Sequence, residues 1–145
     1  MLNNSDLISL LIICTVVVFI ALFFRKVETY DDPLIDRIKR DLIKVDERAS
    51  KLNIRAADKS YTENKKDMYL CLKDKNGNYY PYNMLTYVGL HELAHAISHK
   101  VDESHTSNEF HENFTFLLKK AEELGIYNPN EELIDNYCGV SKNDK

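Results

Sequence analysis

The stretch HELAHAISHKVDESHTSNEF, residues 91–110, decides how the rest of the chain is interpreted, because it holds four of the five histidines. It begins with the pattern HExxH. On a helix, residues four apart lie one turn apart on the same face, so His91 and His95 can direct their imidazoles at one metal ion. Glu92 projects beside this face, where it can reach a metal-bound water without being a ligand. The pattern therefore predicts a zinc site.

A catalytic zinc ion usually has three protein ligands and an open fourth position. His99 lies about 12 Å along the helix from His91, which is too far for both to share one ion with His95, so we expect His99 on the surface or beside the site. The chain must leave the helix and turn back. We favour His105, just before the next helix, as the third ligand, with His111 inside that helix as the alternative.

An uncharged segment, residues 7–24, precedes this domain. As a helix it would rise about 27 Å, near the hydrocarbon thickness of a bilayer. Asp6 stands before it without any Lys or Arg, and the small residues of a signal-peptidase site are missing after it, which favours a retained anchor over a cleaved signal. Arg25 and Lys26 come next, so we expect a single-pass membrane protein with its catalytic domain in the cytosol. The predicted division is an anchor over residues 1–26 and a catalytic domain over 27–145.

Composition narrows the possible partners. The 145-residue chain has a formal net charge of −4, whereas a surface for nucleic-acid backbones requires clustered Lys and Arg. We therefore expect no direct nucleic-acid binding, and a protein or peptide as substrate. The composition does not indicate an oligomeric state. Three scattered cysteines, Cys14, Cys71 and Cys138, are too few for a disulfide framework, so we expect reduced thiols.

Periodicity predicts an α+β domain. Asp32 and Pro33 begin an amphipathic helix that should end near Lys51. A strand is expected between residues 54 and 61, and another over residues 68–72. Asn76-Gly77 then suits a two-residue hairpin turn, so we expect a small antiparallel sheet whose return strand starts at Tyr79.

Two further helices should come after the sheet. Asn83 can cap a helix that runs to about Ser98 and carries HExxH. Residues 106–109, Thr-Ser-Asn-Glu, fit a capping box that opens the last helix, in which Glu109 is the capping acid. Gly125 should end that helix.

HELAH followed by His105 and the pair Glu109-Phe110 resembles the zincin-type metallopeptidases of the WLM and SprT-like group, in which a third histidine close to an aromatic residue follows the HExxH helix. Residues 69–139, including ENFTFLLKKAEELGIY (residues 112–127) and NYCG (residues 136–139), are similar to small uncharacterised WLM-like proteins of large DNA viruses. The resemblance implies a zincin-like fold with zinc held by His91, His95 and His105, and Glu92 as general base. The spacing to the third histidine differs from that of better-known members.

These observations predict a membrane-anchored zinc metallopeptidase that hydrolyses peptide bonds with a zinc-activated water and Glu92 as general base. The alternative is a catalytically inactive module, zinc-binding or metal-free, that binds proteins at a membrane. A closed shell of four ligands, recruiting His111 or Cys138, would favour a structural zinc.

Overall fold

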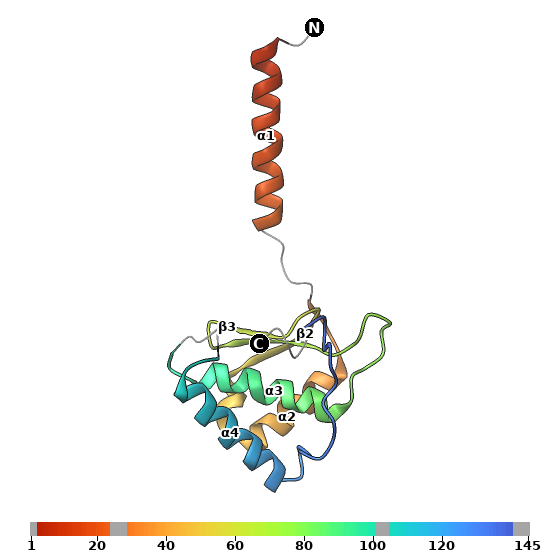
Figure 1. The fold of residues 1–145 in the computed structure, drawn as a ribbon, viewed down its shortest axis with the longest axis vertical. Coiled ribbons are helices and arrows are strands. Elements are labelled where there is room, and N and C mark those ends of the chain that lie inside the picture. Colours follow the sequence, from red (N-terminus) through yellow and green to blue (C-terminus); the bar gives the residue numbers. More distant parts are fainter. Residues whose placement is uncertain (1–2, 24–28, 101–104, 141–145) are drawn as a thin grey trace.

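The computed structural model of the chain describes residues 3–23, 29–100 and 105–140, and within them it shows an α+β fold, as predicted (Figure 1). Three helices lie on one side of a sheet. In chain order the elements are α1 (Asn4–Phe23), β1 (Thr29–Tyr30), α2 (Pro33–Val45), the 3-10 helix η1 (Glu47–Lys51), β2 (Asn53–Ala57), β3 (Tyr61–Glu63), β4 (Asp67–Cys71), α3 (Tyr82–Ile97) and α4 (Asn108–Glu123).

The sheet has the strand order β1-β2-β4-β3 among the described residues. β1 and β3 pair antiparallel with their neighbours, but the central strands β2 and β4 run parallel, from Asn53 opposite Asp67 to Ala57 opposite Cys71. The prediction of an antiparallel sheet is therefore wrong at its centre. The reason is β3, which lies between β2 and β4 in sequence but at the edge in space, so that it serves as the crossover a parallel pair requires.

The predicted hairpin at Asn76-Gly77 is a turn without a return strand. The Asp74 carboxylate accepts hydrogen bonds from the backbone N–H groups of Asn76 (2.8 Å) and Asn78 (2.9 Å), and Gly77 has a φ of 83°. The backbone of Tyr79 pairs with Lys73 in an isolated bridge, and Tyr80 N–H donates to the Leu72 carbonyl at 3.0 Å. The Asp74 side chain thus accepts from two N–H groups of the turn, and the few pairs beyond the turn do not extend into a return strand.

The core lies between the sheet and the helices. α2 begins where predicted, because Asp32 accepts a hydrogen bond from Leu34 N–H at 3.0 Å and Pro33 occupies the first turn. It ends at Val45 and not near Lys51, since Asp46 adopts an extended conformation and caps η1. The apolar face of α2 is buried against α3, and the residues buried on it are Ile35, Ile38, Leu42 and Val45.

The start of α3 differs from the prediction. Its N-cap is Pro81, without a side-chain cap, and Asn83 lies within the first turn. The Asn83 amide instead exchanges two hydrogen bonds with the backbone of Asn128, at 2.9 and 2.8 Å. This side chain therefore connects α3 with the segment after α4.

The predicted transmembrane anchor is contradicted. Within the part of the chain that the structure describes, no helix is both long and apolar enough to cross a membrane. The helix α1 opens with Asn4, Ser5 and Asp6. Three polar residues thus take up the start of this helix, and Phe24 to Lys26 of the predicted anchor and its flank lie outside the described residues. The predicted single-pass membrane localisation, with the domain in the cytosol, is contradicted with it.

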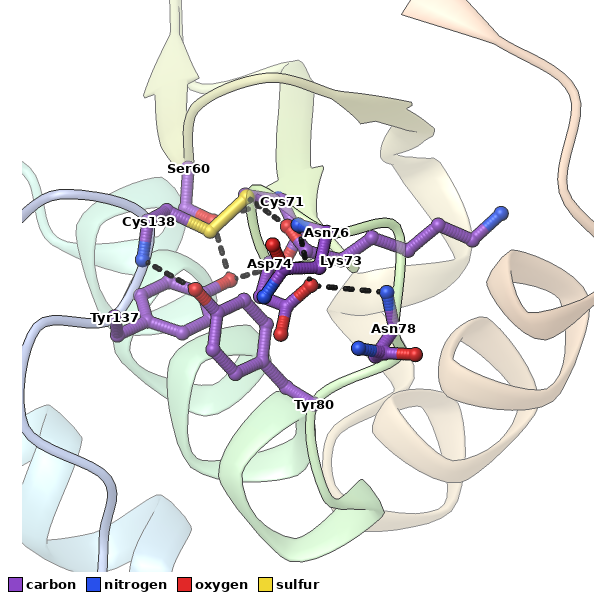
Figure 2. The surroundings of a disulfide bond; sticks show 9 residues. All are labelled: Ser60, Cys71, Lys73, Asp74, Asn76, Asn78, Tyr80, Tyr137 and Cys138. Atoms are coloured by element: carbon purple, nitrogen blue, oxygen red, sulfur yellow. Dashed lines mark hydrogen bonds between the residues drawn. A yellow bond between two sulfur atoms is a disulfide. The ribbon is translucent and has the colours of Figure 1, made fainter.

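The prediction of reduced thiols is also wrong for two of the cysteines, because Cys71 and Cys138 form a disulfide with their Cα atoms 6.4 Å apart (Figure 2). It joins the end of β4 to the C-terminal segment. Beside it the Tyr137 hydroxyl donates to the Cys71 carbonyl and shares a 2.8 Å hydrogen bond with the Ser60 hydroxyl, while the Tyr80 hydroxyl accepts from Cys138 N–H at 2.9 Å. Sequence spacing carried no signal for this pairing, because 67 residues separate the two cysteines.

Breaking this disulfide should lower the free energy of unfolding by about 4 kcal/mol, because the cross-link restricts the unfolded chain over a long loop. Guanidinium denaturation of the Cys71→Ser/Cys138→Ser variant against wild type measures the change. Cys14→Ser is the matched control, since Cys14 is a free cysteine exposed on α1 and its replacement should change the unfolding energy by less than about 0.5 kcal/mol. An unfolding midpoint identical in the double variant and wild type would contradict the assignment.

Candidate metal centre

Three histidines converge between the C-terminal half of α3 and the start of α4. The Nε2 atom of His105 lies 3.0 Å from Nε2 of His91 and 2.9 Å from Nε2 of His95, and the latter two atoms are 3.3 Å apart. Within the described residues these three side chains form a group close enough to bind one metal ion, and no other His, Cys, Asp or Glu completes a larger group with them.

The triangle of nitrogen atoms is poorly suited to hydrogen bonding. Each Nε2 atom is either an N–H donor or a lone-pair acceptor, so among three mutual pairs at least one must join two donors or two acceptors. A shared cation removes this conflict, because all three nitrogen atoms then present lone pairs. Tetrahedral coordination with Zn–N bonds near 2.05 Å places ligand nitrogen atoms about 3.3 Å apart, close to the observed spacing. The arrangement therefore fits a tetrahedral metal ion.

Local structure explains how the third histidine reaches the other two. His91 and His95 are one turn apart on α3 and share a face. His105 has a left-handed backbone, with a φ of 55°, an uncommon conformation that costs an L-residue roughly 1 kcal/mol or more. Shortly after it Ser107 caps α4 by accepting a hydrogen bond from Phe110 N–H at 3.2 Å. The chain thus turns sharply between His105 and the helix, and the strained residue is one of the three converging histidines.

An aromatic side chain supports all three imidazoles from within the core. Phe110, which is 2% exposed, stacks on His95 with ring centroids 4.4 Å apart and makes edge contacts with His91 and His105 at 5.1 Å each. Phe114, one turn further along α4, contacts His91 at 5.2 Å. Such packing restricts the ring orientations and shields one side of the site from water.

Glu92 lies on the side of α3 that faces the sheet. It is 6% exposed, and its carboxylate accepts a hydrogen bond from the Thr62 hydroxyl in β3, with Oε2 and Oγ1 2.9 Å apart. A buried carboxylate needs such donors to replace lost water. The same hydroxyl lies 3.0 Å from the Glu92 carbonyl oxygen. Burial, together with the negative charge of Glu92, raises the pKa of Tyr137.

Glu109 does not complete the predicted capping box. Its carboxylate accepts hydrogen bonds from His99 N–H (2.7 Å) and Lys100 N–H (3.3 Å) and contacts the His99 ring at 2.7 Å. Nearby, Lys65 donates to carbonyl groups of His95, Ser98 and Lys100 at the C-terminal end of α3, where a cation is favourable. Glu109 therefore connects the end of α3 to the start of α4, on either side of residues 101–104.

The other histidines and the remaining cysteine candidate lie apart from the site. The His99 side chain is 94% exposed, as expected for a surface residue. His111 is exposed on α4 and is not one of the three grouped histidines. The Cys138 sulfur is bonded to that of Cys71 in the disulfide. Thr62 is the contact residue that sequence reasoning missed, because its role depends on how β3 docks against α3 and no local pattern signals that.

Comparison with known proteins finds viral relatives. Over 92 residues the chain is 39% identical to the uncharacterised protein 136R of Invertebrate iridescent virus 6, covering 61% of this chain and 50% of the relative. It is 40% identical over 82 residues to uncharacterised protein 042R of Invertebrate iridescent virus 3, and 39% identical over 85 residues to uncharacterised protein R325 of Acanthamoeba polyphaga mimivirus. Each match covers 56% of this chain, with 50% and 42% of the respective relatives.

The chain therefore spans about half the length of the curated relatives it matches. No protein-family model matches it, and no solved structure matches it. The relatives are viral proteins, which agrees with the predicted similarity to proteins of large DNA viruses. Because these relatives are uncharacterised, they indicate no activity for this chain. The zincin assignment stays a prediction.

Replacing Glu109 by Gln should loosen the connection between α3 and α4. Three donors hold the pKa of the Glu109 carboxyl at about 2, the His99 backbone N–H first among them, so the carboxylate keeps its charge well below the usual 4.5. Its contribution to stability is present above pH 4.5 and is lost as the pH falls towards 2. At neutral pH we expect the His99 and Lys100 amides of the variant to exchange with solvent several-fold faster, measured by NMR.

Glu112→Gln, on the exposed surface of α4, is the matched control and should leave both exchange rates unchanged. Equal rates in wild type and the Glu109 variant would show that this carboxylate does not hold the two helix ends together.

Proposed function

We propose that this chain binds one Zn²⁺ ion through the Nε2 atoms of His91, His95 and His105, and that the loaded site hydrolyses peptide bonds. The observation that carries the proposal is the nitrogen triangle, with edges of 2.9 to 3.3 Å. Neutral imidazole ligands in a tetrahedral arrangement suit zinc, whereas Mg²⁺ and Ca²⁺ prefer oxygen ligands in larger shells.

The ligand count supports a catalytic site over a structural one. Structural zinc sites are closed by four protein ligands, whereas catalytic sites leave one position open. Within residues 3–23, 29–100 and 105–140, three histidines form the group that could hold the ion, and the two candidates for a fourth ligand that the sequence suggested, His111 and Cys138, are not part of it.

The chain supplies the other groups that hydrolysis requires. Bound zinc would provide a Lewis acid that polarises the scissile carbonyl and makes water more acidic. Glu92, next to the first ligand and held by Thr62, would accept a proton from the attacking water and pass it to the leaving amine. Phe110 would keep the ligand rings in place and exclude water from the core side.

The substrate would be a protein or peptide in an extended conformation. β3 is an edge strand, so its outer backbone groups can pair with an added strand. Because β3 also packs against α3, a peptide paired there would run beside the helix that carries His91 and Glu92. The resemblance to zincin-type metallopeptidases favours the same substrate class.

Zinc content of the purified chain tests the metal site. We expect one zinc per chain in wild type and in Glu92→Gln, because Glu92 is not a ligand, and less than about a tenth of that in His95→Ala and His105→Ala after dialysis against a weak chelator. Elemental analysis provides the measurement.

His99→Ala and His111→Ala are the matched controls, since both remove an imidazole close in sequence to the site but outside the group of three. Both should retain a full zinc complement. Loss of casein or peptide cleavage in Glu92→Gln with zinc still bound would support the peptidase. Zinc that survives His105→Ala but not His111→Ala would refute the ligand set, and a zinc-loaded wild type that cleaves no peptide would indicate a binding module.

A further inference from the structure

Thr62 lies at the centre of the edge strand β3, directly opposite Met68 of β4. Cross-strand partners share a face of the sheet, and Met68 is fully buried, so Thr62 also faces the helix layer. Its hydroxyl Oγ1 lies 2.9 Å from Oε2 and 3.0 Å from the backbone oxygen of Glu92. One strand residue thus contacts both the side chain and the main chain of the proposed general base.

We infer that Thr62 is a positioning residue, which fixes the orientation of the Glu92 carboxylate for proton transfer. This inference rests on the proposed function. A hydroxyl that donates to Oε2 sets the plane of the carboxylate, and with it the direction in which Oε1 points. Because proton transfer depends on donor–acceptor geometry, a rotated carboxylate would remain buried but would transfer protons poorly.

The residue type suits this role. Threonine is β-branched, so its χ1 angle is restricted and its hydroxyl direction is fixed by the strand backbone. The contact also links two functions of β3, since the strand that would pair with an extended substrate also holds the proposed base. Main-chain pairing of a peptide along β3 would therefore stabilise the position of Glu92.

The test compares wild type with Thr62→Val, Thr62→Ser, Glu92→Gln and the Thr62→Val/Glu92→Gln double variant. Valine keeps the shape and strand propensity of threonine but removes the donor, whereas serine keeps the donor. Zinc content, acetohydroxamate affinity by calorimetry and cleavage of a fluorogenic peptide are measured for each. Acetohydroxamate gives up a proton when it binds zinc, so its affinity reports on a correctly placed carboxylate without requiring turnover.

We expect Thr62→Val to keep one zinc per chain, to bind acetohydroxamate about fivefold to tenfold more weakly and to lower kcat by a similar factor with KM unchanged, as for loss of one hydrogen bond to a charged group. Thr62→Ser should stay within about twofold of wild type. In the Glu92→Gln background, Thr62→Val should have no further effect on hydroxamate affinity, because its effect acts through that carboxylate.

Tyr61→Phe removes a hydroxyl from the opposite face of the same strand and should behave as wild type. Hydroxamate affinity that is unchanged in Thr62→Val, or that falls equally in both backgrounds, would overturn the inference while leaving the zinc site intact. A folded wild type that takes up no zinc would overturn the proposed function and this inference with it. If wild type binds zinc and acetohydroxamate but cleaves no peptide, only the peptidase is overturned, and the hydroxamate comparison still decides the role of Thr62.

Discussion

The convergence of three imidazole nitrogen atoms, each within 3.3 Å of the other two, governs how the surrounding elements are arranged. Their mutual pairs cannot all be hydrogen bonds, so the arrangement is stable only if surrounding packing enforces it or a cation relieves it. Phe110 supplies the packing from the core, and the left-handed backbone of His105 supplies the turn. The three histidines therefore lie close enough together to bind one metal ion.

The helix α3, the edge strand β3 and the disulfide-bonded C-terminal segment form the surroundings of the three histidines. α3 carries two of the three histidines on one face and directs Glu92 towards the sheet, where Thr62 of the edge strand β3 donates a hydrogen bond to its carboxylate. The Cys71–Cys138 disulfide and the hydrogen bonds of Tyr137 attach the C-terminal segment to the end of β4 (Figure 2). A disulfide is typical of proteins that mature in an oxidising environment, which is the opposite of the setting that the scattered cysteines had indicated.

The parts of the site that depend on local sequence could be predicted. HExxH on a periodic helix located His91, Glu92 and His95, and the need to turn back after the helix favoured His105, which the structure brings to the other two. Features that depend on tertiary pairing were missed, including the parallel centre of the sheet, the disulfide and the contact of Thr62 with the helix. The anchor prediction failed because an uncharged run was judged by its composition alone, whereas the helix that forms there begins with three polar residues and no helix among the described residues is long and apolar enough to cross a membrane.

X-ray absorption at the zinc edge of the purified protein is the sharpest test of the three-histidine centre, because it reports the atoms bonded to the metal. We expect three imidazole nitrogen ligands and one further light atom at about 2.0 to 2.1 Å, with the outer-shell scattering typical of imidazole rings. A sulfur ligand at about 2.3 Å, or zinc bound with fewer than three imidazoles, would contradict the assignment of His91, His95 and His105 as a three-histidine site with an open fourth position.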